Sequence, residues 1–119
     1  MTMRRCLILL LVGLAGCGST SEPTIAEKMA VLDGDDAGET AQYEAALDQL
    51  SGRCDDHPSH ERIADMAVVS QKQLAEGGIH ESLLEVLEHV NLAIPEGGDP
   101  DQGCAVYFGG YVFARRGGQ

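Results

Sequence analysis

The feature that most limits what this chain can fold into is a short apolar segment at its start. Apolar and small residues fill positions 6–17, a run of 12 that follows Arg4 and Arg5 and ends at Cys17. A helix that spans a membrane needs about 20 apolar residues, so we expect no permanent span. A basic start, a short apolar core and small residues before a cleavage point are typical of a secretory signal peptide. If the chain is cut before Cys17, residues 1–16 are removed and 103 of the 119 residues remain to fold.

The end of that segment, Leu14-Ala15-Gly16-Cys17, resembles the lipobox of bacterial lipoproteins. In that family the cysteine thiol receives a diacylglyceryl group, and a peptidase then cuts before the cysteine. The resemblance implies lipidation at Cys17 and an anchor in the cell membrane or outer membrane, with the domain facing outside the cytoplasm. Two acyl chains hold a protein at a membrane far more firmly than one. The residue after the cysteine is Gly18 and not an aspartate. In this the sequence resembles lipoproteins that travel to the outer membrane in bacteria with two membranes.

Charge limits the partners of the exported part. All 19 Asp and Glu residues follow Cys17, whereas only six of the eight Lys and Arg residues do, so this part carries a net charge of −13. Such a chain repels the phosphates of nucleic acids and the headgroups of anionic lipids. We therefore expect no binding to nucleic acid.

Export also decides how the four cysteines are used. Cys6 leaves with the signal peptide and Cys17 receives the lipid, so Cys54 and Cys104 remain. Outside the cytoplasm two remaining cysteines usually pair, and we predict a disulfide between them rather than free thiolates that ligate a metal. The bond closes a loop of about 50 residues, for which the chain-entropy model gives about 4 kcal/mol.

Hydrophobic periodicity predicts a small all-α domain over residues 40–116, with four main helices (three to five in total) stapled by the disulfide. Before it, residues 17–39 are predicted to form an acidic, flexible tether with one or two helical turns at residues 25–32. The second main helix is predicted to begin near Pro58-Ser59 and to end at Gly77-Gly78. The first carries apolar residues at i, i+3, i+4 and i+7, namely Tyr43, Ala46, Leu47 and Leu50.

An apolar arc predicts the third helix, and a start signal predicts the fourth. Over residues 81–92 the leucines and valines share one arc, while Glu81, Glu85 and His89 fall on the opposite, solvent-facing arc. The fourth helix is predicted to begin at Asp99-Pro100, an N-cap followed by a proline at the first helical position.

The pair Gly109-Gly110 in the middle of this fourth helix either permits close helix contact or marks a break. The surrounding stretch VYFGGYVF also fits two short strands joined by a glycine turn. A helix is favoured, because the start signal is good and the sequence holds no other strand with which a hairpin could pair.

Few residues suggest chemistry. His57 and His60 lie three apart at the start of the second main helix and are candidate metal ligands together with a neighbouring aspartate. Their spacing matches no closed zinc motif, and we favour a loop in which Asp56 or Ser59 caps the helix N-terminus. The triplet at residues 59–61 has the residue types of a hydrolase, but neighbours on a helix point in different directions and cannot form a relay. We expect neither an enzyme nor a bound cofactor.

The aromatic residues of the last helix are the remaining candidates for contact with a partner. Phe108 and Val112 are expected to pack inward beside the disulfide, and core packing is the favoured interpretation for all the aromatic side chains of this helix. Tyr107 and Tyr111 are the candidates for an exposed interaction surface.

Residues 43–115 resemble small two-cysteine helical domains exported by actinobacteria, many of which have no assigned function. The shared features are a helix that ends near Cys54, a middle pair of helices, and Cys104 in a terminal aromatic helix. The leading expectation is a non-enzymatic, lipid-anchored protein that binds another envelope protein. Two alternatives stay open: a lipoprotein of a phage or prophage that excludes superinfection, and an envelope lipoprotein that binds a metal or small ligand through His57 and His60.

Overall fold

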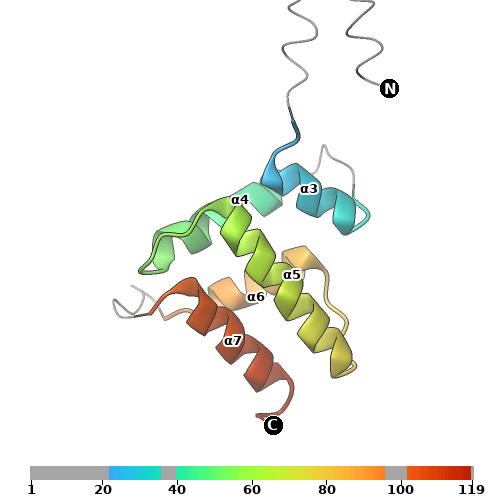
Figure 1. Cartoon of the computed structure of the whole chain (residues 1–119), viewed down its shortest axis with the longest axis vertical. Coiled ribbons are helices and arrows are strands. Elements are labelled where there is room, and N and C mark those ends of the chain that lie inside the picture. Colours follow the sequence, from blue (N-terminus) through green and yellow to red (C-terminus); the bar gives the residue numbers. More distant parts are fainter. Residues whose placement is uncertain (1–21, 36–39, 96–101, 119) are drawn as a thin grey trace, which may run out of the picture.

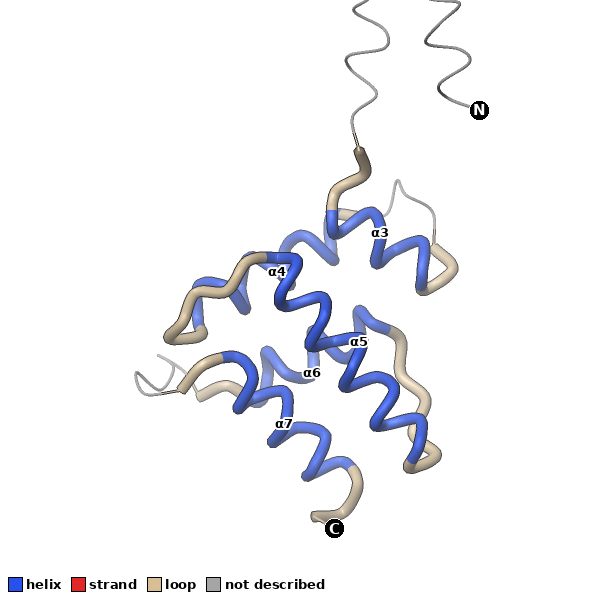
Figure 2. The backbone as a smooth tube through the Cα atoms, viewed as in Figure 1, coloured by secondary structure: helices blue, strands red, loops and turns tan. Residues whose placement is uncertain are grey.

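The structure, a computed structural model, describes residues 22–35, 40–95 and 102–118. Those residues form five α-helices and contain no strand (Figure 1 and Figure 2). The predicted all-α domain of three to five helices is therefore confirmed. None of the described helices is long and apolar enough to cross a membrane. The helices are α3 (Ile25–Leu32), α4 (Ala41–Arg53), α5 (His60–Glu76), α6 (Leu83–Ala93) and α7 (Cys104–Arg115).

The predicted signal peptide at residues 1–16, the lipidation site Cys17 and residues 18–21 and 36–39 of the predicted tether lie outside the described residues. Its middle part, residues 22–35, is described. Ile25–Leu32 was expected as helical turns within a flexible segment, but α3 buries Ala26, Met29 and Ala30 in the common core. The packed domain therefore begins at α3, and not at residue 40.

Three helices begin at side-chain caps that the local sequence supplies. Ser59 accepts a hydrogen bond from the Arg62 amide at 3.2 Å, and α5 starts at the next residue. Before α3 and α6, Thr24 and Ser82 each form a capping box with a glutamate three residues later. Such caps satisfy amide donors that have no partner inside the helix. The expectation of a capping loop before α5 is confirmed for Ser59.

The start of α7 differs from the prediction. Asp99, the expected N-cap, lies outside the described residues, and α7 begins at Cys104 with Gly103 as its N-cap. Gly103 has no side chain with which to cap, and Asp56 accepts the hydrogen bond from the Cys104 amide at 3.2 Å instead, across 48 positions of sequence. The side chain that caps the start of α7 therefore comes from a distant residue, and not from the local sequence as predicted.

Once started, α7 continues without interruption through Gly109 and Gly110. The two alternatives of a break and of a strand hairpin are both wrong. Close helix contact inside the domain is not the reason for these glycines either, because a Cβ added at either position would meet no atom within 4 Å.

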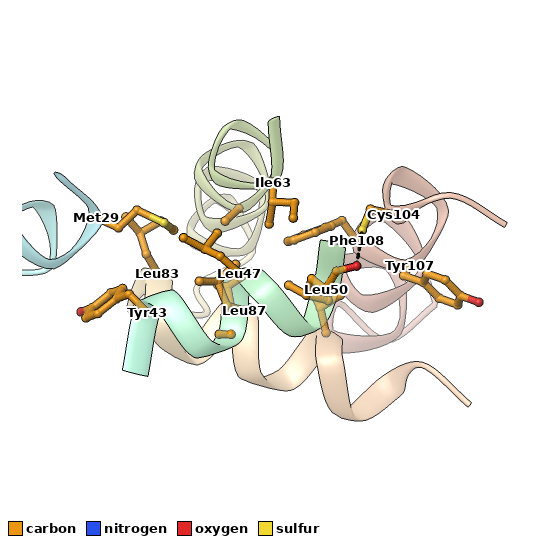
Figure 3. Close-up of a cluster of buried hydrophobic side chains, with 14 of the residues drawn as sticks. Met29, Tyr43, Leu47, Leu50, Ile63, Leu83, Leu87, Cys104, Tyr107 and Phe108 are labelled. Atoms are coloured by element: carbon orange, nitrogen blue, oxygen red, sulfur yellow. Dashed lines mark hydrogen bonds between the residues drawn. The ribbon is translucent and has the colours of Figure 1, made fainter. Parts of the chain in front are cut away.

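The core holds buried side chains from all five helices, and Figure 3 shows part of it, with Cys104 near Leu50 and Phe108. Cys54 and Cys104 form the predicted bond, with Cα atoms 5.1 Å apart and no exposed surface. It joins the residue after α4 to the first residue of α7. Phe108 and Val112 belong to the same core, as expected. The largest fully buried side chains are Tyr43, Met29, Leu47, Leu50, Ile63, Leu74, Leu83 and Leu87.

The first turn of α6 is capped from another helix. The Asp33 carboxylate, just after α3, accepts hydrogen bonds from the amides of Leu83 at 2.8 Å and Leu84 at 3.1 Å. Asp33 and Asp35 also accept from the Tyr43 hydroxyl, each at 2.7 Å. Burial and these two carboxylates hold the pKa of Tyr43 far above its usual value, so the hydroxyl remains a donor. The cluster fixes α3, α4 and α6 to one another.

The last turn of α6 is capped in the same manner by Arg53 at the end of α4. Its guanidinium donates to the carbonyl oxygens of Asn91 and Ile94, both at 2.9 Å. It also donates to the Asn91 side-chain oxygen at 2.8 Å. The last carbonyls of a helix are short of donors, and the Asn91 carbonyl otherwise accepts from the Ile94 amide at 3.3 Å. Arg53 therefore ties the C-terminal end of α6 to α4.

Helices α5 and α7 run side by side in the same direction (Figure 1). At one end, Asp56 before α5 holds the first amide of α7. At the other end, the Arg116 side chain lies against Gly77, with its Nε only 2.9 Å from a Cβ built on that glycine. The pair is therefore joined at both ends, and the residues in between decide what lies on its surface.

Candidate functional site

A hollow of about 300 Å³ lies between α5 and α7, and we call it the α5–α7 groove. Its lining is mainly apolar and comes from Asp65, Met66, Val69, Ser70, Gln73, Ala105, Phe108 and Gly109. Phe108 and Ser70 are buried, whereas Val69 keeps 53% of its surface exposed. The hollow exists because α7 presents small residues one turn apart, Ala105 and Gly109, where two ordinary side chains would fill it.

A second hollow of about 220 Å³ lies on the opposite flank of α5, against α3. Apolar residues such as Met29, Leu32 and Val68 line it, together with the charged residues Lys28, Glu61 and Asp65. Asp65 therefore borders both hollows.

The most connected polar cluster surrounds Glu81, in the loop before α6. Tyr111 donates to both carboxylate oxygens at 2.7 Å, and Arg115 Nη2 donates to Oε2 at 2.8 Å. His89 Nδ1 lies 3.2 Å from Oε1. The Glu81 backbone carbonyl accepts from Gln71 of α5 at 2.8 Å. The cluster joins α5, α6 and α7 through one residue.

The pKa values in this cluster follow from burial and from its hydrogen bonds. Burial by itself would raise the pKa of Glu81, but the hydrogen bonds from Tyr111, Arg115 and His89 outweigh it and lower this pKa below its ordinary value. Burial and the Glu81 carboxylate raise the pKa of Tyr111 to about 12. At neutral pH the cluster therefore holds a carboxylate with its donors in place, an arrangement that clamps helices together.

Sequence reasoning missed this cluster. The helical arc placed Glu81 on the solvent side, but its side chain is only 4% exposed. The reason is that α6 starts two residues later, after the Ser82 cap, so Glu81 belongs to the loop and turns inward. The spacing of Ser82 and Glu85 is a capping-box signal that locates this start. The contact of Glu81 with Tyr111, 30 positions later, has no local signal.

The two candidate metal ligands bind different partners. His57 Nδ1 lies 3.0 Å from the Ser51 carbonyl oxygen, and His60 Nε2 lies 2.7 Å from Asp48 Oδ1. Neither belongs to the only cluster that could hold a metal among the described residues, which consists of Cys54, Asp56 and Cys104. The two sulfurs of that cluster form the disulfide.

The two tyrosines proposed as an interaction surface do not form an exposed patch. Tyr107 is 9% exposed, and the Tyr111 hydroxyl is bound to Glu81. Phe113 and Val106, at 57% and 54% exposure, are the large apolar residues that α7 does present to solvent. Core packing therefore holds for Tyr107 and Phe108 but not for Phe113.

No protein-family model matches this chain, and no match was found among curated proteins or solved structures. The candidate function therefore rests on the residues and their geometry.

Proposed function

We propose that this chain is a lipid-anchored protein of the bacterial cell envelope, without catalytic activity, that binds another envelope protein in the α5–α7 groove. The observation that carries this proposal is the open, apolar hollow above Gly109. An exposed glycine inside a helix lowers its stability by about 1 kcal/mol relative to alanine. The domain makes no close contact at this glycine, whereas a partner that approaches the α7 backbone would do so.

The polar side chains support a binding role rather than catalysis. Glu81, Asp33 and Arg53 each contact two or more groups of other helices, and those contacts hold the scaffold. A rigid scaffold lowers the entropy lost when a partner binds.

The proposed anchor rests on the lipobox resemblance at Cys17. The first residue of α3, Ile25, lies eight positions after this cysteine, and an extended chain of that length reaches at most about 28 Å. A domain held so near a membrane meets partners of the same membrane at a high effective concentration. The anchor and the groove therefore support the same kind of partner.

The groove is tested by photo-crosslinking in the membranes of the native host. A photoreactive amino acid at Gly109 is expected to yield a discrete product that contains a second envelope protein. The matched control is the same amino acid at Glu44, which lies on α4, is exposed and lines neither hollow. Identical products from both positions, or none from Gly109, would contradict the proposed site.

The anchor is tested separately. Protein extracted from its own membranes is expected to carry the mass of a diacylglyceryl group on Cys17, and a Cys17→Ser variant is expected to lose both the lipid and its place in the membrane fraction. An unmodified Cys17 in membrane-extracted protein would reject lipidation while leaving the groove untouched.

A further inference from the structure

We infer that the partner segment in the α5–α7 groove is a basic amphipathic helix, which inserts apolar side chains into the groove and places a basic side chain beside Asp65. This inference rests on the proposed function and names the chemistry of its partner. Three properties carry it, namely the shape of the groove, its charge, and the repulsion of other occupants.

The shape fits a helix. The groove lies between two parallel helices, and a third helix can lie along such a channel with its apolar residues at i, i+3, i+4 and i+7 facing inward. Ala105 and Gly109 form the low wall on α7, so a partner backbone can approach closely there. Phe108 at the base and Val69 at the rim supply apolar surface on both sides.

The charged residue in the lining of the groove is Asp65, which makes no ion pair among the described residues. Asp65 borders the groove, and Glu61 stands one turn earlier on α5. Within the described part of the chain, neither carboxylate makes an ion pair. The nearby Arg62 is paired with Asp56 at 3.5 Å. In the part of the chain that the structure describes, Lys28 of α3 borders the second hollow together with both carboxylates but forms an ion pair with neither, and no cationic residue lines the groove itself. A lysine or arginine on the partner would therefore meet an unpaired Asp65 from the groove side.

The same charge argues against other occupants. A second copy would bring its own net charge of −13, counted from residue 17 on, and would place like charges around the same groove. An anionic lipid surface is repelled for the same reason. A basic helix is the occupant that gains from this field, and its binding should weaken as salt screens the charges.

The test uses the lipidated chain in nanodiscs of a zwitterionic phospholipid, with empty nanodiscs as the reference. The probe is a dye-labelled helical peptide of 18 residues, built from leucine, alanine and lysine with the leucines on one face. Fluorescence anisotropy should show binding above the reference, weaker at higher salt. A matched peptide with glutamate in place of lysine should not bind.

Two pairs of variants locate the binding. Gly109→Leu fills the groove and should weaken binding at least about tenfold, as expected at the centre of an interface. Gly110→Leu adds the same side chain to an exposed position outside the groove and should change binding less than twofold. Asp65→Asn should weaken binding about two- to fivefold, the range of an exposed ion pair, and Glu44→Gln, which removes an equal charge from α4, should not. Circular dichroism confirms that all four variants fold.

The outcomes separate this inference from the function on which it rests. Specific crosslinks at Gly109, together with equal binding of the lysine and glutamate peptides, would overturn the basic helix and leave the docking site. Equal losses in Asp65→Asn and Glu44→Gln would also overturn it, because they would indicate general attraction to an acidic protein. Peptide binding that depends on Gly109 without any crosslinked envelope protein would keep the groove chemistry and reject the proposed function. Self-association that Gly109→Leu abolishes would assign the groove to a second copy instead.

Discussion

Helices α6 and α7 have 11 and 12 residues, yet they are attached to the rest of the domain in different ways. α6 is capped at both ends by side chains of other helices, Asp33 at the first turn and Arg53 at the last, and it turns its apolar stripe into the core. α7 is joined to the domain through a disulfide and the Asp56 carboxylate at one end, and through Arg115 and Arg116 at the other. Its outward face remains exposed.

This difference shows how one small domain divides its tasks. α6 completes the scaffold, because amides of its first turn and carbonyls of its last turn bind side chains from outside the helix. α7 is attached near its two ends and leaves the face between them open beside the α5–α7 groove. If this comparison is right, removing a side chain that attaches either helix to the domain should lower the free energy of unfolding. Changes to the open face of α7 should not lower it.

The largest effect is expected at the fastening of α7. Replacing Cys54 and Cys104 by alanine should lower the free energy of unfolding by about 4 kcal/mol, because the unfolded chain gains the freedom of a 50-residue loop. Urea denaturation followed by circular dichroism, with and without a reductant, measures this change. A denaturation midpoint that is the same in the oxidised and reduced protein would contradict the role of the bond.

The next effect is expected at the N-terminal fastening of α6. Asp33→Ala removes the acceptor of two amides and of the Tyr43 hydroxyl and should cost about 2–3 kcal/mol, since donors inside the fold lose their partner. Asp35→Ala is the matched control, because Asp35 accepts only from the same hydroxyl, and it should cost about 1 kcal/mol or less. Equal losses in the two variants would mean that capping of α6 contributes little.

The link between the two helices at Glu81 should depend on pH. Its folded-state pKa is lowered, so its contribution is present above the ordinary value of about 4.5 and is lost as the pH falls through the lowered value. Glu81→Gln should cost about 1–2 kcal/mol at pH 7, since a neutral amide is a weaker acceptor for Arg115 and Tyr111.

The matched measurement is chemical denaturation from pH 7 down to pH 3. The difference in the free energy of unfolding between the native protein and Glu81→Gln should become smaller below about pH 4.5. For an exposed control, Glu88→Gln, this difference should not change in that way. A difference for Glu81→Gln that stays constant across this range would contradict the lowered pKa.

The smallest effect is expected on the open face of α7 and has the opposite sign. Gly110→Ala should raise the free energy of unfolding by up to about 1 kcal/mol, because Gly110 has no positive φ and a Cβ meets no atom within 4 Å. Thermal denaturation should show a higher midpoint. A lower midpoint would mean that this face is packed against something within the domain.

The sequence predicted the scaffold where its signals were local. The spacing of Tyr43, Leu47 and Leu50, the Ser59 cap and the two remaining cysteines led to helices and a disulfide that the structure confirms. The packing of α3 was missed although Thr24 and Glu27 form a readable capping box, because an acidic neighbourhood suggested a tether.

The candidate site was beyond local signals. The start of α7 depends on Asp56, which is 48 positions away. The inward turn of Glu81 depends on Tyr111 and Arg115 in another helix. The groove arises because Gly109 has no side chain and no neighbouring residue fills the space above it. Whether a neighbour fills that space cannot be predicted from a glycine in the sequence.

The bond between Cys54 and Cys104 also determines how the domain carries tension. A pull between the N-terminal end and α7 passes through α3 and α4, then across the sulfurs into α7, and bypasses the loop that contains α5 and α6. The two cysteines are 50 positions apart, so a fully extended chain gives up roughly 170 Å of length to this crosslink. Load applied at the groove through α7 would therefore reach α4 by a covalent route, while it reaches the α5 wall of the groove only through non-covalent contacts.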